Sequence, residues 1–151
     1  MNKTLSLAVA AVMGCAGANA QTMIEKTTDL TGLTTNDRMT PETLWAMGRI
    51  GGAAAAPDGK TVVYQVAYYS VKENKSHQVL YTQTTDGKRQ TKLTTTAKSE
   101  YEPAWIEGGQ RIAFLTEGQL WSMAADGSDR RQLTHSASDI EGFKFSPDGK
   151  Q

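Results

Sequence analysis

A repeat of forty residues runs through the second half of this chain and limits its fold more than any other feature. Four features recur at that interval: Leu80 as Leu120, Asp86-Gly87 as Asp126-Gly127, Leu93-Thr94 as Leu133-Thr134, and Trp105 as Phe145. A fixed period of about 40 to 45 residues is typical of the four-stranded blades of a β-propeller. We therefore predict an all-β fold built from blades of four antiparallel strands.

Turn residues divide each repeat into strands. Pro57-Asp58-Gly59-Lys60 and the two Asp-Gly pairs are strong turn signals, because proline presets φ, aspartate bonds to the following backbone and glycine accepts positive φ. We expect strands at 53–56, 61–69 and 78–83 and a short fourth strand ending near Leu93-Thr94. The second unit should have strands at 102–106, 111–115, 119–124 and 131–134, and a third unit should open with a strand at 141–145. The apolar runs at Val62-Val63-Tyr64 and Ile112-Ala113-Phe114-Leu115 suit strands covered on both faces.

The chain divides into six predicted segments. They are a signal peptide (1–20), a polar extension (21–39), a short helix leading into the propeller (40–50), a first blade (51–95), a second blade (96–135) and the truncated start of a third (136–151). Two blades cannot close a propeller, which typically takes 4 to 8. We therefore expect an incomplete propeller that belongs to a larger protein.

The N-terminus has the pattern of an export signal. Lys3 precedes an apolar run, and Ala18-Asn19-Ala20 supplies small residues for cleavage after Ala20. The run is too short to cross a bilayer. Export to the periplasm or outside the cell follows, and a lipid anchor at Cys15 is the less favoured alternative.

Composition excludes several classes of function. After cleavage at Ala20 no cysteine remains, so disulfides and thiolate metal sites are not expected. The remaining charges nearly balance and are interspersed, which does not favour a nucleic-acid surface. No later segment is apolar enough to span a membrane.

A helix is predicted directly before the first blade. Thr40 can cap it, Pro41 suits its first position and Gly48 can end it, with an apolar face from Leu44, Trp45 and Met47. We expect Trp45, Trp105 and Trp121 to be packing residues.

The first unit carries about ten more residues than the second, around 68–77. We expect an extended hairpin that projects from the blade. It is either a lid or domain contact, or a tolerated surface extension. Tyr68 and Tyr69 could form an aromatic peptide-binding cluster there, although burial is the more common role for such residues.

No catalytic, cofactor or metal site is predicted in this chain. No glycine is followed two positions later by serine, so a Gly-x-Ser-x-Gly elbow is absent. His135-Ser136-Ala137-Ser138-Asp139 is read as a polar loop, because triad residues normally converge in space. His77 and His135 are too few for a histidine metal site, and the segment at Asp126–Asp129 is read as a turn and not as a calcium loop. Asn74-Lys75-Ser76 matches a glycosylation acceptor only weakly.

Several of these motifs, taken together, resemble the N-terminal part of the prolyl oligopeptidase family of serine peptidases. They are Thr40-Pro41-Glu42-Thr43-Leu44-Trp45, Arg49-Ile50, Ala56-Pro57-Asp58-Gly59-Lys60, Val62-Val63-Tyr64, Leu80-Tyr81, Asp86-Gly87, Leu93-Thr94 and Phe145-Ser146-Pro147-Asp148-Gly149-Lys150. Within the family, the bacterial dipeptidyl-peptidase and acylaminoacyl-peptidase-like branch is the most similar. Glu100-Tyr101-Glu102 does not match the paired-glutamate motif by which some dipeptidyl peptidases hold a substrate's amino terminus.

The resemblance implies a substrate-gating propeller in an exported serine peptidase that hydrolyses peptide bonds in oligopeptides. Its α/β-hydrolase domain and Ser-Asp-His triad would follow Gln151. No cofactor is implied, and the partners would be peptide substrates. The alternative is a non-enzymatic periplasmic propeller, similar to TolB, that mediates protein contacts. The repeat alone leaves both open, along with the oligomeric state and the choice between endo- and exopeptidase.

Overall fold

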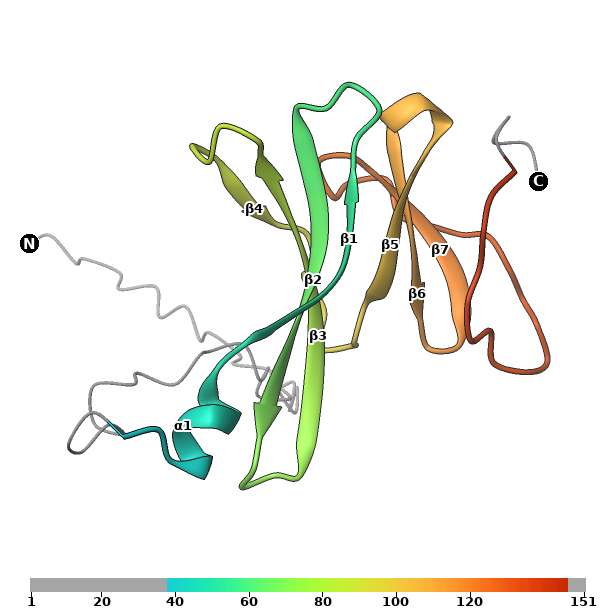
Figure 1. The fold of residues 1–151 in the computed structure, drawn as a ribbon. Coiled ribbons are helices and arrows are strands. Elements are labelled where there is room, and N and C mark those ends of the chain that lie inside the picture. The colour runs from blue at the N-terminus through green and yellow to red at the C-terminus, as the bar shows by residue number, and fades with distance from the viewer. Residues whose placement is uncertain (1–37, 147–151) are drawn as a thin grey trace, which may run out of the picture.

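A computed structural model describes residues 38–146, which form one short helix, α1 (Pro41–Ala46), and two four-stranded antiparallel sheets (Figure 1). The first sheet contains β1 (Arg49–Ala55), β2 (Thr61–Ser70), β3 (Lys75–Thr84) and β4 (Gln90–Lys92), in that order. The second contains β5 (Tyr101–Ile106), β6 (Arg111–Thr116), β7 (Gln119–Ala124) and β8 (Arg131–Gln132). The predicted fold class, all-β with blade-like sheets, is confirmed. The expected signal peptide, Cys15, the 21–37 part of the extension and the last turn (147–150) lie outside the described residues.

Each Asp-Gly pair closes the same turn in its sheet. In the first, the Gly87 N–H donates to the Thr84 carbonyl at 2.9 Å and the Asp86 carboxylate accepts from the Lys88 N–H at 3.1 Å. In the second, the corresponding distances at Ala124 and Ser128 are both 2.9 Å. Gly87 and Gly127 have φ of 75° and 90°, which glycine adopts without steric cost. Local turn chemistry therefore explains the repeat of this pair.

The Leu-Thr pair repeats because it closes the outer edge of each sheet. The Thr94 hydroxyl accepts the Leu80 N–H at 2.8 Å, while the Leu93 N–H donates to the Leu80 carbonyl at 2.8 Å. Thr134 and Leu133 repeat both bonds with Leu120, at 2.9 and 2.8 Å. A threonine hydroxyl thus continues the ladder of backbone bonds where the fourth strand ends.

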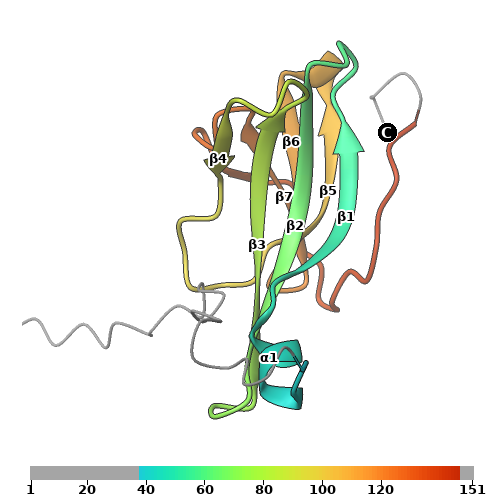
Figure 2. The ribbon, with the colours of Figure 1, turned by 60° about the vertical axis from the view of Figure 1, so that its left-hand side comes forward.

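The main core lies between the two sheets, which stand side by side in Figures 1 and 2. Six buried side chains form it, three from each half: Val63, Leu80, Leu93, Ile112, Phe114 and Met123. Every residue of β6 is buried. The prediction that this apolar strand is covered on both faces is therefore confirmed. Trp105 and Trp121 pack against the core as expected.

Strand bounds differ from the predictions where residue type is a poor guide. β1 begins at Arg49 and not at residue 53, although Gly51 and Gly52 are weak strand formers; a register shift between Ile50 and Ala53 absorbs them. β3 begins at Lys75 and not at 78, because the hairpin pairs to its tip. The strand expected at 141–145 is wrong: residues 141–146 pair with no other strand in the described part of the chain.

The helix has the predicted start but a different end. Thr40 caps it, accepting the Thr43 N–H at 3.2 Å, and Pro41 occupies the first turn. The helix stops at Ala46, and Gly48 does not take the left-handed conformation of a C-cap. A Cβ on Gly48 would lie 2.8 Å from the Tyr68 ring, so this glycine is needed for close approach and not for a turn.

Candidate functional site: the helix and hairpin end of the first sheet

The hairpin of β2 and β3 projects beyond the rest of the fold. Its strands pair continuously from Thr61 and Thr84 to Ser70 and Lys75, ten residues each, whereas β6 and β7 have six each. The tip extends past the second sheet toward α1 in both ribbon views (Figures 1 and 2). The predicted extended hairpin is confirmed.

Arg49 packs against two aromatic rings in a cation–π stack that joins the helix to the hairpin. The guanidinium carbon of Arg49 lies 4.6 Å from the ring centroid of Trp45 and 4.8 Å from that of Tyr69. The two rings are 5.4 Å apart in an edge-to-face arrangement. Each cation–π contact contributes roughly 0.5 to 1 kcal/mol at an exposed site. The stack therefore fixes the helix against the hairpin, although Trp45 stays partly exposed.

Tyr68 and Tyr69 do not form the single cluster that the sequence suggested. Neighbouring residues of a strand point to opposite faces of the sheet. Tyr69 meets Trp45, whereas the Tyr68 hydroxyl lies 3.2 Å from that of Tyr81 on the other face. Tyr81 in turn stacks on Tyr64 at 5.8 Å. Only Tyr69 can contribute to a site on the helix side.

Beside the stack is a hollow of about 440 Å³, bounded by α1 and the hairpin tip. Trp45 and Tyr69 form its aromatic wall, and Asn74 and Lys75 lie at the tip. Asn74, the residue of the weak glycosylation match, is exposed with φ of 50°. The hollow is large enough for a side chain or a short peptide segment.

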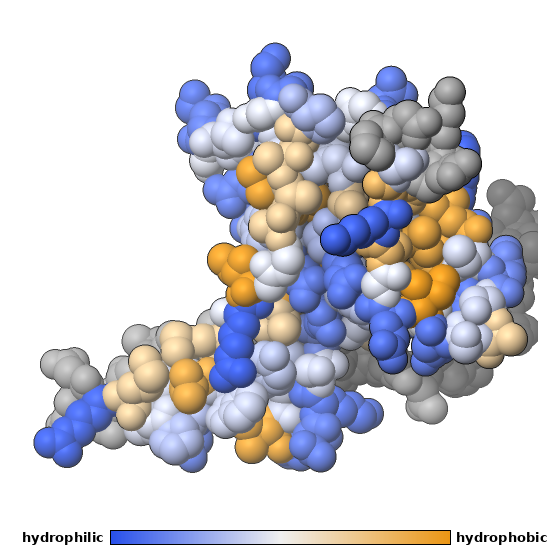
Figure 3. Space-filling view, turned by 45° about the vertical axis from the view of Figure 1, so that its right-hand side comes forward, coloured by the Kyte–Doolittle hydropathy of each residue, from blue (hydrophilic) through white to orange (hydrophobic). Residues whose placement is uncertain are grey.

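Exposed apolar side chains gather at this same end. Met39, Leu44, Trp45 and Val71 are 67%, 42%, 41% and 68% exposed. The apolar residues expected on the helix, Leu44 and Trp45, are therefore exposed, and its buried residue is Thr43. Figure 3 shows apolar side chains at this lower end of the molecule. An exposed cluster of this kind is typical of a contact surface.

The residue types of a catalytic triad do not converge in the described residues. His135 is exposed, and no hydrogen bond joins it to Ser136, Ser138 or Asp139. The Ser136 hydroxyl instead accepts the Ser138 N–H at 3.3 Å, in a polar loop as predicted. His77 is buried instead, with Nε2 3.1 Å from the Lys98 carbonyl oxygen, at the base of the hairpin.

Asp126 lies in a turn, as predicted, and Asp129 forms ion pairs with Arg111 and Arg131. Asp126 accepts from the Ser128 hydroxyl at 2.6 Å and from the Ser128 N–H, and these bonds hold the pKa of its carboxyl below the usual value. The Arg131 and Arg111 guanidiniums likewise lower the pKa of Asp129. Within residues 38–146 no cluster of three metal-binding side chains occurs. None of the helices in that range is long and apolar enough to cross a membrane.

Glu100 has a role that the sequence does not indicate. It is 1% exposed and forms an ion pair with Arg130. The two are thirty positions apart in the chain. No local pattern marks them, because the partner comes from the next sheet.

No family model matches the sequence, but two curated relatives do. Dipeptidyl-peptidase 5 of Porphyromonas gingivalis is 42% identical over 156 aligned positions, which cover all of this chain and 22% of the relative. Dipeptidyl-peptidase 5 of Porphyromonas endodontalis is 44% identical over 117 positions, covering 75% of this chain and 17% of the relative. The chain is therefore related to dipeptidyl peptidases. The resemblance seen in the helix and blade motifs is confirmed.

The chain also shares its fold with a solved structure. Pyrococcus horikoshii acylaminoacyl peptidase superposes with a TM-score of 0.52 at 14% identity, covering 62% of this chain and 15% of that one. At 14% identity this similarity shows a shared fold and nothing further. The chain spans about a fifth of the length of the curated relatives it matches.

Proposed function

We propose that this chain is the substrate-gating propeller portion of an exported serine peptidase that hydrolyses peptide bonds in oligopeptides. The observation that carries the proposal is its identity of more than 40% to two dipeptidyl peptidases. The catalytic α/β-hydrolase domain, with a Ser-Asp-His triad, would lie beyond Gln151. Residues 38–146 position and screen the substrate, and the reaction occurs in the α/β-hydrolase domain.

The helix and hairpin end is the surface that suits contact with the catalytic domain. It combines the exposed Trp45 and Val71 with the hollow beside Tyr69. The curated relatives are about five times longer than this chain, so a large further part of the protein is available to cover this end. Burying such apolar side chains at a domain boundary favours association.

The N-terminal segment supports export of this peptidase. Residues 1–20 have the basic start, apolar run and Ala18-Asn19-Ala20 site of a cleaved signal peptide. Mass spectrometry of the mature protein tests this directly. A mature N-terminus at Gln21 supports release, whereas a lipid on Cys15 indicates a membrane-anchored form.

A fluorophosphonate probe applied to the full-length gene product tests the serine peptidase assignment. Such probes react covalently with activated serines. Labelling at a serine beyond Gln151, together with release of short peptides from an oligopeptide, is expected. A product that remains unlabelled and leaves peptides intact, yet retains protein partners on a column, would make the non-enzymatic propeller the correct reading.

Substitutions at the hairpin tip test the gating role. Val71→Asp places a charge on the exposed apolar end, and it should lower kcat/KM for oligopeptides severalfold by loosening the domain contact. Thr85→Asp, at an exposed position just past the opposite end of β3, is the control and should leave kcat/KM within about twofold. Equal kinetics for both variants would remove the hairpin from the gating mechanism.

A further inference from the structure

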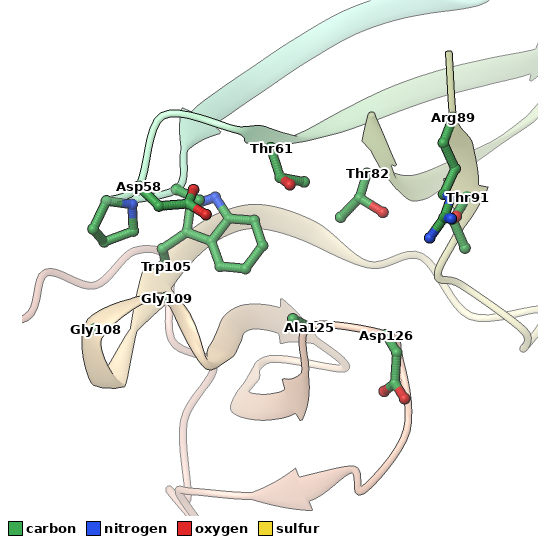
Figure 4. A pocket seen from close by; sticks show the side chains of 12 residues that line it. Asp58, Thr61, Thr82, Arg89, Thr91, Trp105, Gly108, Gly109, Ala125 and Asp126 are labelled. Carbon is green, nitrogen blue, oxygen red and sulfur yellow. The ribbon is translucent and has the colours of Figure 1, made fainter. Parts of the chain in front are cut away.

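A second hollow, of about 450 Å³, opens between the two sheets at the end opposite α1 (Figure 4). The first sheet contributes the turn at Pro57-Asp58 together with Thr61, Thr82, Arg89 and Thr91. The second contributes Trp105, the Gly108-Gly109 turn and Ala125-Asp126. The hollow has no part in the function proposed above.

Close contact between two turns forms one end of this hollow. Gly109 has φ of 92°, and a Cβ there would lie 3.0 Å from Cδ of Pro57. A larger residue would push the turns apart. Trp105 lies beside them, its indole N–H bonded to the Ala54 carbonyl at 2.9 Å, so that its ring is held as a flat apolar wall.

Arg89 supplies an uncommitted positive charge. Its side chain extends into the hollow in Figure 4, and its guanidinium makes no hydrogen bond or ion pair with any residue from 38 to 146. The Arg89 N–H donates to the Thr84 hydroxyl, and the Arg89 carbonyl accepts the Thr84 N–H. These two bonds fix the backbone from which the side chain extends. A free guanidinium in a concave site is a strong binder of carboxylates, which it can hold through two parallel N–H···O bonds.

Two carboxylates, those of Asp58 and Asp126, also line the hollow. Asp58 uses one carboxylate oxygen to accept the Lys60 N–H, at 2.9 Å, and Asp126 uses one for Ser128. The second oxygen of each has no partner in the described part of the chain. Figure 4 shows Asp58 beside Trp105, on the far side from Arg89, and Asp126 below. Such oxygens can accept bonds from an ammonium group.

The threonine hydroxyls complete the polar lining. Thr61, Thr82 and Thr91 line the space between the charged groups, and each hydroxyl can donate or accept a bond. The lining therefore combines a cation with one carboxylate on the far side and another below, together with polar groups and one aromatic wall. A volume of about 450 Å³ lies within the usual range of small-ligand sites.

We infer that this hollow is a non-catalytic binding site for a short peptide with free termini, of dipeptide size. The carboxylate of the ligand binds Arg89, and its ammonium group binds Asp58 or Asp126. The threonines contact the peptide bond, and an apolar side chain packs on Trp105. This inference is independent of the proposed peptidase activity, because it concerns binding at residues that take no part in hydrolysis.

The test is isothermal titration calorimetry of L-alanyl-L-phenylalanine with the full-length gene product. Saturable binding is expected. N-acetyl-alanyl-phenylalanine and alanyl-phenylalaninamide each lack one charge and should bind at least tenfold more weakly, since a charge-assisted bond is lost. Arg89→Met should weaken binding of the free dipeptide by a similar factor and leave the affinity for alanyl-phenylalaninamide unchanged. Lys88→Met, an adjacent exposed cation outside the hollow, is the matched control and should stay within about twofold.

A second pair of variants examines the ammonium end. Asp58→Asn and Asp126→Asn keep the side-chain oxygen that each turn needs, so the fold should be retained, which a thermal melt checks. At least one of the two variants should bind the free dipeptide tenfold more weakly. The inference is overturned if the dipeptide does not bind, if Arg89→Met and Lys88→Met bind it equally, or if capping either terminus leaves affinity unchanged.

Discussion

The carboxylate of Glu100 forms an ion pair with the guanidinium of Arg130, and this pair joins the end of the first sheet to the second. Glu100 also accepts the Thr94 hydroxyl at 2.7 Å, and Arg130 also donates to the Leu93 carbonyl at 2.8 Å. The Arg130 guanidinium lies 5.4 Å from the ring centroid of Phe114. A buried polar network therefore crosses the boundary between the sheets beside an otherwise apolar core.

Replacing Glu100 should destabilise the protein strongly. Glu100→Gln leaves Arg130 without its charge partner in a mostly buried position, and breaking such a pair costs about 3 kcal/mol. Urea unfolding measures the change. Glu117→Gln removes the exposed partner of Lys98 and is the control, with an expected cost below about 1 kcal/mol. Similar costs for the two would mean that the buried pair does not join the sheets.

The two repeated threonines should differ in importance. Thr94→Val keeps the shape of the side chain but removes the acceptor for the Leu80 N–H and the donor to Glu100, so we expect a loss of about 2 kcal/mol. Thr134→Val removes the equivalent bond to Leu120 where the site is only partly buried, and should cost about 1 kcal/mol or less. A larger effect at Thr134 would contradict this ranking.

Gly48→Ala should strain the packing beneath the hairpin. The new methyl would lie 2.8 Å from Cε1 of Tyr68 and 2.9 Å from Cγ1 of Val66, and overpacking of this kind costs about 1 to 3 kcal/mol. Gly52→Ala, whose nearest atoms lie at 3.8 Å, is the matched control and should be nearly neutral. The cost of Gly48→Ala should fall in a Tyr68→Ala background; if it does not, the tyrosine is not the obstacle.

Acid should weaken the ion pairs of Asp129. A hydrogen bond from Arg131, and then one from Arg111, lowers the pKa of this carboxyl in the folded protein. The stabilisation is present above the unfolded pKa, near 3.9, and is lost as pH falls through the lower folded pKa. An NMR titration should place the Asp129 midpoint below 3.9, and Arg131→Met should raise it. An unchanged midpoint in that variant would assign the shift to another group.

Turns and strand interiors could be predicted because their causes are local. Asp86-Gly87 and Asp126-Gly127 close their turns through bonds within five residues, and β7 has the predicted bounds. The candidate site could be predicted only as an extended hairpin. The stack of Arg49 on Trp45 and Tyr69 depends on where the helix packs against β2, and no spacing in the chain indicates that.

The forty-residue period and the turn chemistry by themselves determined a fold of four-stranded antiparallel units, because strand and turn preferences act over a few neighbouring residues. Tertiary structure alone decided which polar groups became buried partners. Glu100 meets Arg130 only because the two sheets pack together and bring segments thirty positions apart into contact. Burial then sets the strength of each contact, since charges removed from water interact strongly with whatever lies beside them.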